Sequence, residues 1–195
     1  MSNRGIVATS QPLATQAGVS MLWQGGNAID AAIATAAALN VVEPMMTGLG
    51  GDVFALVYLS RSNELKGLNA SGRAPYAANL ETLRNLDYQK MPETGIHTVT
   101  IPGALDGWCS LLDNYGTMNL AQVLAPAIAL AEHGFPVTEV IGHWWQVNTA
   151  KLQANADAAR TYLPAGRAPA PGEIFVQPEL ANTFKKIAQG GRDVF

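Results

Sequence analysis

The sequence has 195 residues, a formal net charge of −3 and 14% charged residues beside 48% hydrophobic ones. This length is sufficient for a sizeable hydrophobic core, and the scattered Lys and Arg residues argue against a nucleic-acid partner. Because ordinary domains carry roughly 25% charged residues, we expect part of the surface to be covered by more protein.

The first third of the chain predicts a strand, two helices and a hairpin. A short strand is expected at 5–10, and a helix follows from Pro12, since a first helical turn tolerates proline. Asn27 is the expected N-cap of an alanine-rich second helix. Strands at 53–59 and 64–69 are joined by the turn SRSN, and the first, VFALVYL, is expected to be a buried strand.

The glycines of MMTGLGGDVFALVY stand between the second helix and the first hairpin strand. A phosphate cradle requires the opposite order, in which a glycine loop follows a strand and opens a helix. Gly48, Gly50 and Gly51 therefore indicate a tight passage from helix to strand.

Helices dominate the remainder of the chain. They are expected at 80–86, from about 103 to 116, over 137–163 and over 177–191. Pro126 is expected to divide 119–134 into a short helix and a longer one, because an interior proline removes a hydrogen bond. The order predicts an α+β fold with helices on one face of an antiparallel sheet, and residues 1–195 as a single piece without an internal domain boundary.

Few residues form a recognisable catalytic or metal-binding pattern. His97, His133 and His143 share no metal-ligand spacing, so neither a metal site nor a cofactor is expected. Cys109 is the only cysteine, which excludes an internal disulfide. No G-x-S-x-G element marks a serine nucleophile.

Two charged residues near the hairpin ends are candidates for a binding site. Asp52 follows the Gly50-Gly51 turn, where capping of the turn is favoured over catalysis. Arg73 follows Gly72 after the second strand and is suited to clamp a carboxylate. A salt bridge from Arg73 to a neighbouring acid is the alternative.

The chain shows no sign of membrane insertion. Its longest apolar stretch, 31–42, is interrupted by polar residues and is shorter than the roughly 20 residues that a membrane span requires. The start MSNRGIVATSQPLA lacks the apolar stretch of a secretory signal. We expect a cytoplasmic protein without a membrane span.

Four ordered blocks resemble the N-terminal part of the gamma-glutamyltranspeptidase family, which includes related acylases. They are QAGVSMLWQGGNAIDAAIATAAALNVVEPMMTGLGGDVFALVY, the AP at Ala74-Pro75, TVTIPGALDGWCSLLDNYGTMNLAQVLAPAIALAEHGF, and FVQPELANTFKKIAQGGRDVF. The resemblance extends over nearly the whole chain.

The resemblance implies an N-terminal nucleophile hydrolase-like αββα sandwich, here only in part, made as a precursor that cuts itself into a large and a small subunit. In this family the threonine freed at the start of the small subunit attacks the γ-glutamyl amide of glutathione or a similar small molecule. The acyl group then passes to water, an amino acid or a peptide.

The chain matches the first part of the large subunit and contains no T-x-H-x-[ST] processing pattern. The resemblance therefore implies that no catalytic residue lies in this chain, which alone is expected to be inactive. Its implied partners are the remaining part of the large subunit and the small subunit.

Two departures from the family bear on the substrate. The family's carboxylate clamp is R-E-x-A-P, whereas this chain has SGRAP, with Ser71 at the arginine position and Arg73 two residues later. If the strand continues, both face the same side, and we predict Ser71 and Arg73 as substrate-binding residues. Asp52 stands where the family tends to carry glycine. An acylase-like relative with a different acyl substrate, or a non-catalytic scaffold, are the alternatives.

Overall fold

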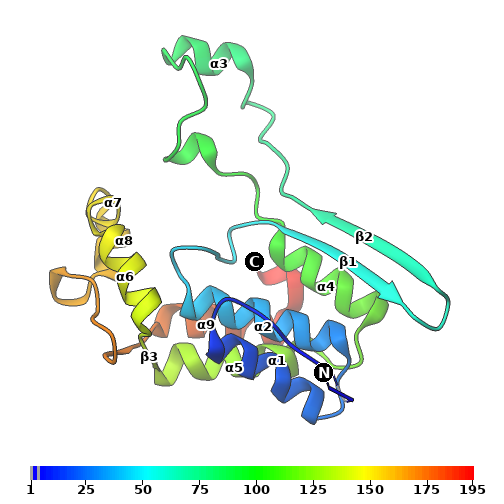
Figure 1. Ribbon diagram of the computed structural model, residues 1–195. Coiled ribbons are helices and arrows are strands. Elements are labelled where there is room, and N and C mark those ends of the chain that lie inside the picture. The colour runs from blue at the N-terminus through cyan, green and yellow to red at the C-terminus, as the bar shows by residue number, and fades with distance from the viewer. Residues whose placement is uncertain (1, 4) are drawn as a thin grey trace. The chain divides into compact units, whose positions relative to one another are not determined.

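The structure, a computed structural model, describes residues 2–3 and 5–195. They cluster into two compact units, one of Met1–Gly48 with Leu111–Phe195 and one of Leu49–Ser110 (Figure 1). Two packed units are not by themselves two domains that fold independently. The prediction that residues 1–195 have no internal domain boundary therefore stays a prediction.

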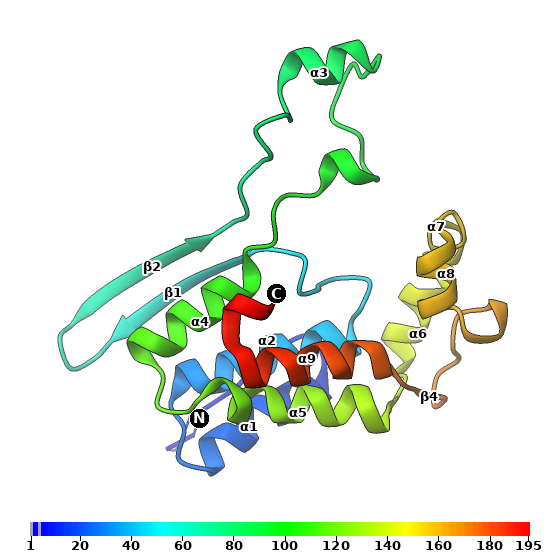
Figure 2. The ribbon, with the colours of Figure 1, turned by 180° about the vertical axis from the view of Figure 1, so that it is seen from behind.

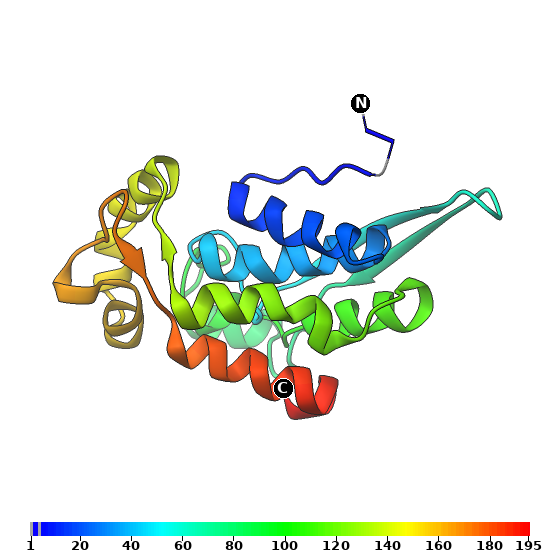
Figure 3. The ribbon, with the colours of Figure 1, turned by 90° about the horizontal axis from the view of Figure 1, so that it is seen from below.

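The first unit is built on four helices that lie side by side in the order α1, α2, α5, α9 (Figure 3). Their bounds are α1 Pro12–Trp23, α2 Ala28–Val42, α5 Leu120–His133 and α9 Pro178–Gly190. The smaller elements of this unit are β3 Phe135–Pro136, α6 Glu139–Val147, α7 Thr149–Gln153, α8 Ala156–Tyr162, η2 Pro164–Gly166, β4 Ile174–Phe175 and η3 Gly191–Val194. The predicted helices at both ends of the chain are confirmed.

Helix α2 is the centre of this unit, packed between α1 and α5. Ala34, Ala37 and Ala38 are fully buried, and their small side chains let the neighbouring helices approach closely. The predicted N-cap is confirmed, because the Asn27 side chain accepts from the N–H groups of the first turn. No helix in the described ranges is long and apolar enough to cross a bilayer.

The predicted break at Pro126 is wrong, since α5 runs without interruption through this residue. The proline removes one hydrogen bond from the helix interior. Val123, Leu124 and Ala127 are fully buried around it, and α5 packs against α2 on one side and α9 on the other. Burial of this apolar face outweighs the local loss.

The predicted strand at 5–10 is also wrong. Nothing in the described part of the chain pairs with this segment, and a strand requires a partner for its backbone groups. Residues Gly5–Thr9 instead border a groove of about 490 Å³ whose other walls come from α1 and α2.

The second unit holds the predicted hairpin, with β1 Val53–Leu59 antiparallel to β2 Glu64–Ala70 (Figure 2). It also contains α3 Leu80–Asn85, η1 Ile96–Thr98 and the first turns of α4 Ala104–Tyr115, which crosses into the other unit. The expectation that β1 is buried is wrong for one of its faces, where Phe54 is 66% and Leu56 79% exposed. Within its own unit this face has no apolar layer to pack against.

Candidate substrate-binding site

The two residues predicted to bind substrate, Ser71 and Arg73, lie directly after the end of β2 and are exposed. The hairpin register pairs Val53 with Ala70, so the chain that enters β1 and the chain that leaves β2 are neighbours here. If β2 continued to residue 73, the Ser71 and Arg73 side chains would lie on the same side of the strand. The strand does not continue, because β2 ends at Ala70.

Asp52 ties the two chains together at this end of the hairpin. Its Oδ1 atom accepts a hydrogen bond of 2.7 Å from the Gly72 N–H and a longer one of 3.4 Å from the Thr100 hydroxyl. Hydrogen bonds to an ionised carboxylate are roughly twice as strong as those between neutral groups. The carboxylate thus joins distant segments, and the predicted capping of the Gly50-Gly51 turn is not among its hydrogen bonds to the described residues.

The segment that precedes α4 lies along the same loops. The Ile101 N–H donates to the Arg73 carbonyl oxygen at 3.0 Å. The N–H groups of Gly103 and Ala104 donate to the Gly51 carbonyl oxygen at 3.1 and 3.0 Å. The residues on both sides of the hairpin opening are thus hydrogen-bonded to a third piece of chain.

Two glycines make this close approach possible. A Cβ atom on Gly72 would lie 1.6 Å from the Ile101 carbonyl oxygen, and one on Gly103 would lie 2.3 Å from the Ala70 carbonyl oxygen. Both obstructing atoms belong to the backbone, so they cannot swing aside as the end of a side chain can. Only glycine fits at these two positions.

Arg73 is exposed. Among the described residues, no carboxylate lies within ion-pair distance of it, so the alternative of a neighbouring salt bridge finds no partner there. The Ser71 N–H donates to the Asn69 side-chain oxygen at 2.9 Å. The site therefore presents a cation and a hydroxyl on a backbone held by hydrogen bonds.

The histidines lie in ordinary structural settings. His97 packs edge-on against Tyr88, His143 packs edge-on against Trp144, and His133 stands in the last turn of α5, where a cation is favourable. Within residues 2–3 and 5–195, no three His, Cys, Asp or Glu side chains come together as a possible metal site.

Asp30 forms a buried polar network in the first unit. Its carboxylate accepts from the Asn27 N–H at 2.7 Å, from the Thr117 hydroxyl at 2.6 Å and from the Thr117 and Met118 N–H groups at 3.0 and 3.1 Å. Burial acts to raise the pKa of Asp30, but these hydrogen bonds together lower it below 3.8. The network joins the start of α2 to the turn before α5 and is structural.

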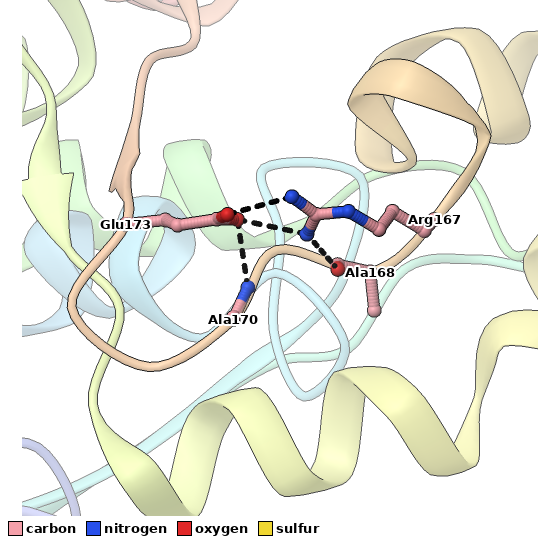
Figure 4. A network of polar contacts seen from close by, with 4 residues as sticks. All are labelled: Arg167, Ala168, Ala170 and Glu173. Atoms are coloured by element: carbon pink, nitrogen blue, oxygen red, sulfur yellow. Dashed lines mark hydrogen bonds and ion pairs between the residues drawn. The ribbon is translucent and has the colours of Figure 1, made fainter.

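A second polar network organises the proline-rich loop before β4 (Figure 4). Arg167 donates from two guanidinium nitrogens to the Glu173 carboxylate at 2.6 and 2.9 Å and also to the Ala168 carbonyl oxygen. The Ala170 N–H donates to the same carboxylate at 2.8 Å. The Arg167 hydrogen bonds, with that of Ala170, lower the pKa of Glu173 to about 2.

No pattern in the sequence singles out Thr100 and Ile101, which contact Asp52 and Gly72. The extended character of TVTIPG before a helix is the single signal that this segment lies along another chain segment. The pairing itself joins residues far apart in the sequence, so spacing cannot reveal it.

Comparison with known proteins identifies the family. The sequence profile described as Gamma-glutamyltranspeptidase matches residues 14–195. The glutathione hydrolase-like YwrD proenzyme of Bacillus subtilis is 39% identical over 99% of this chain, which spans 38% of that relative's length.

Solved structures agree over almost the whole chain. The gamma-glutamyltranspeptidase of Helicobacter pylori superimposes with a TM-score of 0.92 at 30% identity, covering 98% of this chain and 56% of that one. The cephalosporin acylase of Bacillus halodurans gives a TM-score of 0.87 at 43% identity, covering 97% of this chain and 38% of that one.

These matches confirm the predicted fold class, an α+β N-terminal nucleophile hydrolase fold that is present here in part. They also confirm the resemblance drawn from the four sequence blocks, since the matched range includes all four of them. The chain belongs to the gamma-glutamyltranspeptidase family.

Proposed function

We propose that residues 1–195 are the first part of the large subunit of a self-cleaving amidohydrolase. The mature enzyme cleaves a γ-glutamyl amide and passes the acyl group to water, an amino acid or a peptide. The proposal extends the family assignment, because the chain spans only about a third of the relatives it matches. The nucleophilic threonine lies outside these residues, and residues 1–195 alone are inactive.

The observation that carries the proposal is the setting of Arg73. Its guanidinium has no ion-pair partner in the described chain, and its backbone carbonyl is fixed by Ile101. A guanidinium presents parallel N–H donors that match the two oxygens of a carboxylate. We assign Arg73 to the carboxylate of the substrate and the Ser71 hydroxyl to a neighbouring hydrogen bond.

An acylase acting on a different acyl group is the second candidate. It is favoured by the higher identity to the cephalosporin acylase, 43% against 30% for the gamma-glutamyltranspeptidase of Helicobacter pylori. The serine at position 71 favours it too, because the family's usual clamp has arginine there. A terminal carboxylate on the acyl group would satisfy Arg73 in either case.

The experiment that tests the proposal is intact-mass analysis of the full-length protein during incubation. Hydrolysis of γ-glutamyl-p-nitroanilide and glutaryl-p-nitroanilide is assayed alongside. These probes differ by one ammonium group and share the position of the carboxylate. Splitting into two subunits with preference for the γ-glutamyl anilide supports the first candidate, and preference for the glutaryl anilide supports the acylase. A protein that never splits and hydrolyses neither probe would be a non-catalytic scaffold.

A further inference from the structure

We infer that Asp52 is a positioning residue for substrate binding and acts through Arg73. Its carboxylate accepts the Gly72 N–H at 2.7 Å and so holds the peptide between Ser71 and Gly72, one residue before Arg73. The inference rests on the proposed function, because it takes Arg73 as the group that binds the substrate carboxylate.

The geometry explains why such a residue is needed. Arg73 follows a glycine, the residue that restricts the backbone least. Its carbonyl oxygen is anchored by the Ile101 N–H, which holds the chain on the C-terminal side of Arg73. The bond from the Gly72 N–H to Asp52 holds the peptide between Ser71 and Gly72, so the chain is restrained on both sides of Arg73 and its side chain starts from a restricted direction.

The surroundings indicate a local rather than a global role. Residues 71–99 contain no buried side chain, and Asp52 itself is exposed. Loss of the hydrogen bond therefore removes no core packing and is expected to loosen this loop alone. A loosened guanidinium binds a carboxylate less well, because the ordering must then be supplied when the substrate binds.

The shift of arginine from position 71 to position 73 explains why a hydrogen bond between Gly72 and Asp52 is needed. An arginine at position 71 would follow directly from the paired end of β2, whereas Arg73 lies beyond it. At position 71 the backbone would be restrained by the strand pairing next to it. Near Arg73, the hydrogen bond to Asp52 supplies that restraint. Aspartate at position 52 and arginine at position 73 therefore form one unit.

The test is a double-mutant cycle in the full-length, self-cleaved protein, with γ-glutamyl-p-nitroanilide and glutaryl-p-nitroanilide as probes. Asp52→Ala is expected to raise KM about tenfold with a much smaller change in kcat. Asp52→Asn keeps an oxygen acceptor for the Gly72 N–H and is expected to stay within about threefold of the parent KM. In an Arg73→Ala background, Asp52→Ala is expected to change KM less than about twofold, because the two residues act as one unit.

The outcomes separate the inference from the proposed function. If Arg73→Ala leaves KM unchanged, the role of Arg73 in the proposed function fails. If Arg73→Ala raises KM but Asp52→Ala does not, or acts equally in both backgrounds, the positioning role alone is overturned. A lower KM for Asp52→Asn would also overturn it, because Asp52 would then act by repelling the substrate carboxylate. The thermal unfolding midpoint of each variant is measured as the check that the fold is retained.

Discussion

The N–H of Gly72 donates to the carboxylate of Asp52 at 2.7 Å, across 20 residues of sequence. This bond joins the entry and the exit of the hairpin beside Arg73, and the Ile101 carbonyl oxygen closes the space around Gly72. The position of Arg73 thus depends on a glycine that nothing larger can replace.

Gly72→Ala is expected to lower kcat/KM about a hundredfold, because the added Cβ forces the backbone of this loop out of position by about an ångström. Steady-state hydrolysis of the anilide probes measures the effect. Gly67→Ala is the matched control, since its Cβ would meet only the Leu56 side chain, at an ordinary 3.8 Å. Equal activity of the two variants would show that the close approach at Gly72 is unimportant.

Asp30→Ala is expected to lower the free energy of unfolding by about 3 kcal/mol, because several part-buried N–H groups and the Thr117 hydroxyl lose their acceptor. Urea unfolding of the full-length protein measures this loss. Asp157→Ala serves as control, since Asp157 also stands in the first turn of a helix but is exposed, and its carboxylate pairs with Arg160 on the surface. A similar loss in both variants would contradict the structural role of Asp30.

The same network predicts a pH dependence. The pKa of Asp30 is lower in the folded protein than its usual 3.8, so the folded state favours the carboxylate form. Its contribution to stability is present above pH 3.8 and is lost as the pH falls through the lowered value. In Asp30→Ala, stability should fall less steeply over this acid range. If stability fell with pH as steeply in Asp30→Ala as in the parent protein, carboxylates other than Asp30 would be responsible for the acid sensitivity.

Glu173 is expected to titrate near pH 2 instead of its usual 4.5, because Arg167 and the Ala170 N–H bind its charged form. The carbon-13 shift of the Glu173 carboxyl, followed by NMR from neutral to acid pH, measures this pKa. Arg167→Ala should return the midpoint toward 4.5. A parent midpoint close to 4.5 would mean that the ion pair does not persist in solution.

Local sequence signals predicted much of the fold. Asn27 marks a helix start, and SRSN between two β-prone runs marks a hairpin; both are found. Failures arose where distant residues decide the outcome. Packing of α5 between two helices keeps Pro126 inside one helix, and the segment at 5–10 is not a strand because no partner in the described chain pairs with it.

The candidate site shows the same division. Ser71 and Arg73 were predicted from a family pattern, and both are exposed at the end of the hairpin. The bond from Gly72 to Asp52 and the pairing of Arg73 with Ile101 have no local signature, because they depend on how three segments come together. The binding roles of Ser71 and Arg73 stay predictions, and so does the compartment of the protein.

Substitution of Arg73 by alanine tests the central claim most directly. Removal of a charge-assisted, two-pronged hydrogen bond is expected to weaken binding by about 2–3 kcal/mol, seen mainly as a higher KM for the γ-glutamyl or glutaryl anilide. Butyryl-p-nitroanilide, which lacks the carboxylate, should respond little. Arg61→Ala, an exposed arginine in the hairpin turn, is the control and should leave KM unchanged. An unchanged KM for Arg73→Ala would contradict the assignment of this site to substrate binding.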